Sequence, residues 1–307
     1  GPMASWPPGL MASCLMAYYP LHEEQNTSPE TLARVEARER GTVHDNALVS
    51  AITEDLDVGV GIIMEGLETL GLEDNTYLIY MGDNGHRDND NPVRSSSLES
   101  QAPLMGAKGN VSEGGIRVPF IIRGPGVASN SWSHEPVVGY DFFPTFAEWA
   151  EIEADQLPEG IEGGSLVALL ENNGIGEVQR PNEGLVFHFP HFQAGSPQSA
   201  IRVGDYKLIK YYEGNRIVLF DLSKDLGERH NLAEQMPVKA AELELRLDRY
   251  LASVNAQMPR VNLQFDPQKP TETRTGGQFS RTIPYDPEDD PKHIYFPHLA
   301  PLIYPNL

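Results

Sequence analysis

The stretch that decides the fold class is an apolar run passing directly into small polar residues, Thr76-Tyr77-Leu78-Ile79-Tyr80-Met81-Gly82-Asp83-Asn84-Gly85. Its first six residues favour a β-strand that is apolar on both faces. The segment before it places apolar residues at helical spacing from about Asn46 to Leu70, and Gly71 is well placed to end that helix. A helix followed by a buried strand predicts an α/β fold with a mostly parallel sheet and flanking helices.

The remaining sequence extends this prediction in both directions. Further buried strands and helices are expected at Ser13–Tyr19, Pro29–Glu39, Val118–Arg123 and Asp141–Ala150. From residue 199 the apolar period becomes two, and turn residues at Gly204-Asp205 and Glu213-Gly214-Asn215 separate three short runs. The three expected strands are Ser199–Val203, Tyr206–Tyr212 and Ile217–Leu222. We therefore expect a small C-terminal antiparallel sheet, packed with a helix from about Val238 to Val254.

These elements and the composition between them predict four regions. They are a partial α/β domain at 1–153, a linker with substrate-side loops at 154–198, an antiparallel subdomain at 199–265 and a proline-rich acidic tail at 266–307. Because buried strands without neighbours expose hydrogen-bonding groups and apolar surface together, we also expect self-association through unpaired sheet edges.

The composition of the 307 residues excludes several functions. Asp and Glu number 44 against 23 Lys and Arg, a formal net charge of -21, whereas nucleic-acid binding needs a basic face. A polyanionic substrate would need a local basic pocket or a metal ion. No apolar run approaches the ~18–20 residues of a membrane span. The single cysteine, Cys14, excludes an internal disulfide.

Candidate ligand residues follow the central strand. Asp83 and Asn84 offer adjacent hard oxygen donors between glycines, which suits Ca²⁺ or Mg²⁺. Ligands in open α/β sheets bind beyond the carboxyl ends of the strands, and this pair lies at such an end. Asp-Asn-Gly is also a common turn, so the ordinary structural interpretation stays open.

A second group of candidates lies in two glycine-rich strings. Lys108 stands in Gly106-Ala107-Lys108-Gly109, where its ammonium can approach an oxyanion closely. Arg117 stands in Glu113-Gly114-Gly115-Ile116-Arg117-Val118-Pro119, where it either binds the same anion or pairs with Glu113. A lysine beside glycine is also common in solvated loops.

Taken together, these strings resemble the sulfatase family of the alkaline-phosphatase superfamily, over roughly residues 11 to 266. The matching strings, in family order, are Tyr18-Tyr19-Pro20-Leu21-His22, Leu70–Thr76, Gly82–Gly85, Gly106–Gly109, Glu113–Pro119, Asp141-Phe142-Phe143-Pro144-Thr145, His188-Phe189-Pro190-His191, Ala200–Leu208 and Leu219–Leu222 leading into Asn231-Leu232-Ala233. The resemblance implies an alkaline-phosphatase-like fold, hydrolysis of sulfate esters, and a periplasmic or extracellular location.

Roles are carried over from this resemblance only where a residue matches the family pattern. Asp83 and Asn84 resemble two of the calcium ligands, Lys108 the lysine that holds the sulfate group, and His22 the histidine near the leaving oxygen. Arg117 stays a candidate for substrate binding on the local grounds given above. His188 and His191 resemble a segment that reaches toward the substrate in carbohydrate-acting members, and two histidines satisfied by backbone groups are the alternative.

Two family features have no counterpart in this sequence. One is a first strand ending in paired aspartates, which supply the other calcium ligands. The other is Cys-x-Pro-Ser-Arg, whose cysteine becomes the formylglycine nucleophile. Cys14 is followed by Leu15-Met16-Ala17-Tyr18 and does not match. We therefore expect the C-terminal part of a sulfatase, inactive on its own, with Ca²⁺ binding that is weak or absent.

The leading functional hypothesis is therefore a sulfuric ester hydrolase by descent. Its partner would be a sulfated carbohydrate or an aryl sulfate ester. The alternatives are a catalytically dead relative that binds a sulfated glycan or another anion, and a phosphoester or phosphonate hydrolase of the same superfamily.

Overall fold

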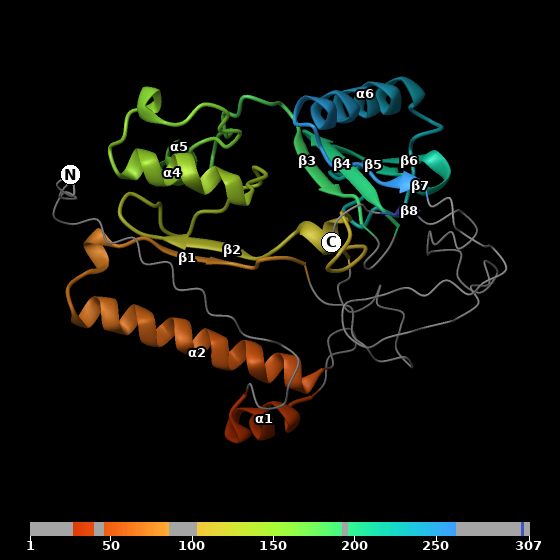
Figure 1. The fold of residues 1–307 in the computed structure, drawn as a ribbon. Coiled ribbons are helices and arrows are strands. Elements are labelled where there is room, and N and C mark those ends of the chain that lie inside the picture. Colours follow the sequence, from red (N-terminus) through yellow and green to blue (C-terminus); the bar gives the residue numbers. More distant parts are fainter. Residues whose placement is uncertain (1–26, 40–45, 86–102, 192–195, 262–301, 304–307) are drawn as a thin grey trace. The chain divides into compact units, whose positions relative to one another are not determined.

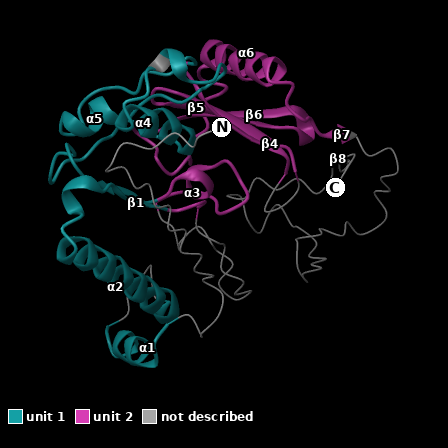
Figure 2. Cartoon of the chain, turned by 60° about the vertical axis from the view of Figure 1, so that its left-hand side comes forward, with its two compact units in different colours: residues 1–81, 119–182 teal, residues 82–118, 183–307 magenta. Residues whose placement is uncertain are grey.

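The computed structural model describes residues 27–39, 46–85, 103–191, 196–261 and 302–303 (Figure 1). The predicted strand at Ser13–Tyr19, with Cys14, and the candidate His22 lie outside these residues. The chain forms two compact units (Figure 2). Unit 1 comprises residues 1–81 and 119–182, and unit 2 comprises residues 82–118 and 183–307.

Unit 1 begins with two helices, α1 (Pro29–Glu36) and α2 (Ala47–Thr69). Asn46 caps α2 by accepting a hydrogen bond from the Val49 amide, and Gly71, with a φ of +65°, follows its end, as the sequence predicts. Asp55 of α2 accepts hydrogen bonds from the hydroxyl groups of Thr27 and Thr31 and from the Ser28 amide. These bonds tie the start of α1 to α2.

A strand pair follows, β1 (Leu78–Met81) and β2 (Phe120–Arg123). The two strands are antiparallel, with Leu78 opposite Arg123 and Met81 opposite Phe120. The expected parallel pairing is therefore wrong for these strands. An apolar run indicates that a strand is buried on both faces, but it does not indicate the direction of the strand. Two parallel neighbours need a crossover connection between them, usually a helix. In the described part of residues 82–119 the only helix is α3 (Glu113–Ile116), which is four residues long.

The remaining elements in the described part of unit 1 are short helices. They are η2 (Glu73–Asn75), η3 (Gly139–Asp141), α4 (Phe142–Trp149), η4 (Ala154–Gln156) and α5 (Val167–Glu171). Leu166, Leu169 and Val178 form the centre of a small core. The predicted helix at Asp141–Ala150 is confirmed as α4.

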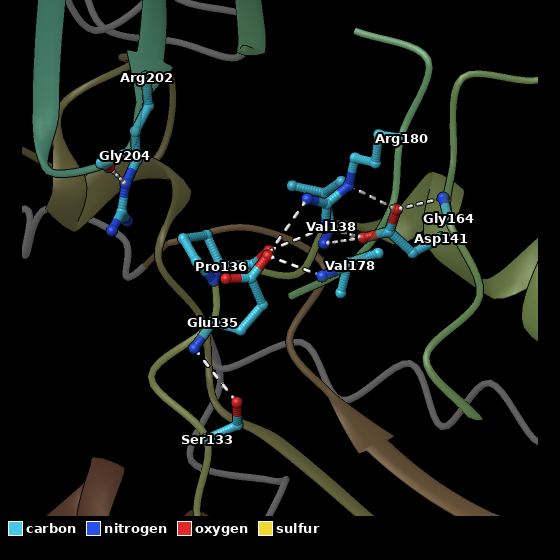
Figure 3. A network of polar contacts seen from close by, with 10 residues as sticks. All are labelled: Ser133, Glu135, Pro136, Val138, Asp141, Gly164, Val178, Arg180, Arg202 and Gly204. Carbon is cyan, nitrogen blue, oxygen red and sulfur yellow. Dashed lines mark hydrogen bonds and ion pairs between the residues drawn. The ribbon is translucent and has the colours of Figure 1, made fainter. Parts of the chain in front are cut away.

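A buried ion pair, between Asp141 and Arg180, links distant segments of this unit (Figure 3). The carboxylate of Asp141 is fully buried and accepts hydrogen bonds from Arg180 at 2.9 and 2.7 Å and from the amides of Val138 at 2.8 Å and Gly164 at 3.0 Å. Burial disfavours the charge on Arg180, but its hydrogen bonds to Asp141 outweigh burial and raise the pKa of the guanidinium. Asp141 therefore joins three chain segments that are distant in sequence.

Unit 2 contains a four-stranded antiparallel sheet in the order β3 (Leu185–Phe189), β4 (Gln198–Val203), β5 (Tyr206–Tyr211) and β6 (Arg216–Asp221). Its other elements are α3, η5 (Glu213–Asn215), α6 (Pro237–Ser253) and the short pair β7 (Arg260–Val261) and β8 (Leu302–Ile303). The three predicted strands and the final helix are confirmed. Strand β3 was not predicted, because its run Leu-Val-Phe-His-Phe does not alternate cleanly between apolar and polar residues.

The two faces of this sheet contact different parts of unit 2. One face packs Ile201, Leu208 and Leu219 against α6, which lies along the sheet in Figure 1. The opposite face packs Ala200 and Ile209 with Val111, a residue of the glycine-rich segment. The glycine-rich segment that contains Val111 therefore packs on this face of the antiparallel sheet. Among the described residues, no helix has both the length and the apolar character needed to cross a bilayer.

Candidate functional site

Three strings of the sequence meet by direct backbone hydrogen bonds in unit 2. The Gly85 amide, directly after Asp83 and Asn84, donates to the Gly115 carbonyl at 2.9 Å. The Gly114 amide donates to the Met105 carbonyl at 2.7 Å, just before Lys108. We call this meeting point of residues 83–85, 105–110 and 112–117 the glycine junction.

The glycine junction excludes side chains at its centre. A Cβ on Gly115 would lie 2.6 Å from the Ala107 carbonyl oxygen and still closer to that of Asn110. A Cβ on Gly114 would lie 2.6 Å from the Met105 carbonyl oxygen. The obstructing atoms are backbone atoms, so glycine is needed here for close approach of the segments.

Lys108 lies in a tight turn at the edge of the glycine junction. The Asn110 amide donates to the Ala107 carbonyl at 3.2 Å, and Gly109 has a φ of +96°, which fits a type II turn with Lys108 at its second position. The Lys108 side chain is exposed. Its ammonium is therefore available to an anion from solvent.

Arg117 lies at the other edge of the glycine junction, directly after α3. It is also exposed, and it pairs with Glu113 at 3.3 Å. The internal pair considered from the sequence is thus present, and the substrate contact stays a prediction.

Asp83 and Asn84 follow the end of β1 after Gly82; Asp83 is exposed and Asn84 half-buried. A calcium ion takes six to eight oxygen ligands. Within the described part of the chain, no group of three or more His, Cys, Asp or Glu side chains is arranged to hold a metal ion. These two residues therefore do not amount to a calcium site by themselves, and Asp88 and Asp90 lie outside the described residues.

His188 is held on both ring nitrogens by other groups of unit 2. Its Nε2 lies 2.8 Å from the Gln257 carbonyl oxygen, so Nε2 carries the proton and donates. Its Nδ1 then accepts from the Ser199 hydroxyl at 2.6 Å, and Ser199 in turn accepts from Tyr212 at 2.7 Å. Burial lowers the pKa of His188, consistent with a neutral ring.

His191 is half-buried, and its ring meets Phe189 edge-on at 5.7 Å between centroids. A substrate contact by either histidine stays a prediction. For His188, such a contact would require giving up one of its two hydrogen bonds.

Sequence reasoning missed two buried charged residues, Lys207 and Glu228, next to this site. Lys207 of β5 contacts Glu113 at the start of α3, and Glu228 contacts Lys207 in turn. Strand alternation gave a usable signal, since it places Lys207 on the same face of the expected strand as the apolar Ile209. A lysine predicted at a buried strand position needs a charged partner.

Comparisons with known proteins agree with this geometry. The sulfatase family model matches residues 22–152, and the model of the N-sulphoglucosamine sulphohydrolase C-terminal region matches residues 107–257. A sulfatase of Formosa agariphila is 34% identical over 228 residues, covering 68% of this chain and 39% of the relative. Arylsulfatase K of Mus musculus is 29% identical over 222 residues, covering 70% of this chain and 36% of the relative. The chain belongs to the sulfatase family.

Solved structures show the same fold. The crystal structure of Ps i-CgsB in complex with k-i-k-neocarrahexaose has a TM-score of 0.61 and 23% identity, covering 76% of this chain and 48% of the other. A second structure, in complex with its substrate D-glucosamine-2-N,6-O-disulfate, has a TM-score of 0.55 and 24% identity, covering 74% and 46%. The fold is thus the alkaline-phosphatase-like α/β fold of sulfatases. The chain spans about two fifths of these curated relatives and about half of the solved chains.

Proposed function

We propose that this chain provides the sulfate-binding part of a sulfuric ester hydrolase that acts on sulfated carbohydrates. The observation that carries this proposal is the glycine junction, which brings Asp83, Asn84 and Lys108 onto neighbouring segments. A disulfated glucosamine is the substrate named for one structural neighbour, which supports the carbohydrate class.

The chemistry follows from the residues of this chain. The Lys108 ammonium neutralises the charge on the sulfate oxygens, and His22 assists the departing alcohol. Arg117 is placed to help bind the anion, at the expense of its pair with Glu113. The nucleophile string Cys-x-Pro-Ser-Arg does not occur in the 307 residues. We infer that this polypeptide alone has no sulfatase turnover.

The first prediction concerns that activity. We expect the chain, incubated with a chromogenic aryl sulfate and Ca²⁺, to release product no faster than the blank. Turnover that disappears in Lys108→Ala but survives in Lys224→Ala would contradict the proposal. Lys224 is a matched control, because it is an exposed lysine of the same unit that pairs only locally, with Asp221 at 2.6 Å.

The binding role of Lys108 has its own measurement. Inorganic sulfate should shift the amide resonances of residues 105–110, and Lys108→Ala should remove those shifts while Lys224→Ala leaves them unchanged. Amide resonances that shift with sulfate, in a chain without turnover, are also expected from the alternative in which the chain is a catalytically dead glycan-binding relative. A saccharide matched with and without its sulfate distinguishes that alternative from a general anion site.

The second prediction concerns calcium. Asp83 and Asn84 supply too few oxygens and too little charge for tight binding, so we expect calorimetry to show at most millimolar affinity, on the order of weak extracellular modules. Asp74-Asn75 repeats the same dipeptide before β1, outside the glycine junction, and Asp74→Ala is the control. A tight site lost in Asp83→Ala but kept in Asp74→Ala would show that other carboxylates complete it.

A further inference from the structure

Three charged side chains to which the proposed reaction gives no role meet in one buried cluster of unit 2. The Lys207 ammonium lies 2.8 Å from a Glu113 carboxylate oxygen and 2.9 Å from one of Glu228. The exposed fractions of Lys207, Glu113 and Glu228 are 0%, 3% and 2%. Each comes from a different part of the chain, namely β5, α3 and the segment after β6. We call these three residues the ionic cluster.

The ionic cluster joins the antiparallel sheet to both ends of the glycine junction. Glu113 is the first residue of α3 and immediately precedes Gly114 and Gly115, and its own amide donates to Glu228 at 2.7 Å. Gly227, beside Glu228, packs so closely on the start of the Lys108 segment that a Cβ there would lie 2.7 Å from the Pro103 carbonyl oxygen. Lys207 is therefore linked to the segment that bears Lys108 through Glu113 and the hydrogen bond from the adjacent Gly114 amide to the Met105 carbonyl.

Stability alone is a weak explanation for this arrangement. Burial opposes ionisation of Glu113, but the charges of Lys207, Arg202 and Arg117 outweigh it and lower the pKa of Glu113. Burial raises the pKa of Glu228, and Lys207 only partly offsets it. Glu228 also has a φ of +52°. This backbone conformation is unfavourable for any residue other than glycine. Buried ions add little net stability over apolar residues of similar size, but they can specify one arrangement.

We propose that Lys207 is a positioning residue, which fixes the glycine junction against the antiparallel sheet through Glu113 and Glu228 and thereby sets the place of Lys108. The effect expected on sulfate binding rests on the proposed function of Lys108. The effect expected on the position of the glycine junction is independent of that function.

The chain offers a matched control on the same strand. Lys210 also forms ion pairs, with Asp248 at 2.8 Å and Glu244 at 3.0 Å, but on the α6 side of the sheet. Its side chain is 13% exposed. Lys207→Met and Lys210→Met therefore remove equivalent charges from opposite faces of β5.

The experiment is hydrogen exchange on the full chain, resolved by residue. We expect Lys207→Met to speed exchange at the Gly114 and Gly115 amides by about tenfold or more, while Leu208 and Leu219 in the sheet keep their protection. Lys210→Met should leave both amides of the glycine junction unchanged. The positioning role is wrong if Lys207→Met speeds amide exchange in the glycine junction and in the sheet by the same factor. It is also wrong if exchange in the glycine junction does not change.

A sulfate titration supplies the functional readout. We expect Lys207→Met to weaken the binding of inorganic sulfate at residues 105–110 by about tenfold, because a misplaced ligand loses its geometry. If the unsubstituted chain does not bind sulfate, the proposed function is wrong. The hydrogen-exchange experiment still decides whether Lys207 fixes the glycine junction. If Lys207→Met does not fold, Glu113→Gln keeps the shape of the side chain, and the same selective loss of protection at Gly114 and Gly115 is expected.

Discussion

Replacing Gly115 with alanine should separate the Lys108 segment from α3 and remove sulfate binding at the glycine junction. The added Cβ would fall 2.6 Å from the Ala107 carbonyl oxygen and closer still to that of Asn110. Both atoms belong to the backbone, so no side chain can move aside to admit it. We expect the free energy of unfolding to fall by about 3 kcal/mol, the upper end of overpacking costs.

The control for this substitution is Gly61→Ala in α2. A Cβ at Gly61 meets nothing within 4 Å, and alanine favours a helix over glycine by about 1 kcal/mol. Gly61→Ala should therefore be neutral or stabilising in urea denaturation followed by circular dichroism. A Gly115→Ala variant with an unchanged unfolding midpoint and unchanged sulfate shifts would mean that the glycine junction is looser than this structure shows.

The second large effect is expected from Asp141→Asn in unit 1. The substitution keeps the shape of the side chain but removes the nearer opposite charge from the buried Arg180 guanidinium, 9% exposed, and leaves it the longer contact with Glu135 at 3.7 Å. Breaking a buried ion pair from one side costs about 3–5 kcal/mol. The amides of Val138 and Gly164 donate to different oxygens of Asp141, so one of them would face the NH2 group of asparagine and lose its acceptor (Figure 3). Unfolding can be followed by tryptophan fluorescence, because Trp132 and Trp149 lie in unit 1.

An exposed pair in the same unit provides the comparison. Glu73 and Arg123 lie 3.3 Å apart with side chains 43% and 55% exposed, and solvent screens such pairs strongly. Glu73→Gln should therefore shift the fluorescence midpoint far less than Asp141→Asn. Equal shifts in the two variants would show that burial does not set the strength of the Asp141–Arg180 pair.

Local sequence signals predicted the helices and the hairpins well. Helix α2 begins after Asn46 and ends before Gly71, because capping and chain reversal depend on neighbouring residues. Strands β4, β5 and β6 follow from a period of two and from turn residues between them. Strand direction was not predictable in this way. The apolar run at Leu78–Met81 indicates a strand, but its antiparallel partner Phe120–Arg123 is chosen by packing across residues distant in sequence.

The features of the candidate site also separate into those that the sequence predicts and those that only the structure shows. The sequence by itself determined the family strings, their order, and the glycines and candidate ligands within them, because each is a matter of residue type and spacing. Only the tertiary structure decided that Gly85 meets Gly115, that both nitrogens of His188 are bonded, and that Lys207 lies between Glu113 and Glu228. Hydrogen bonds and ion pairs act over a few ångströms in space, and a sequence states only how far apart their partners lie along the chain.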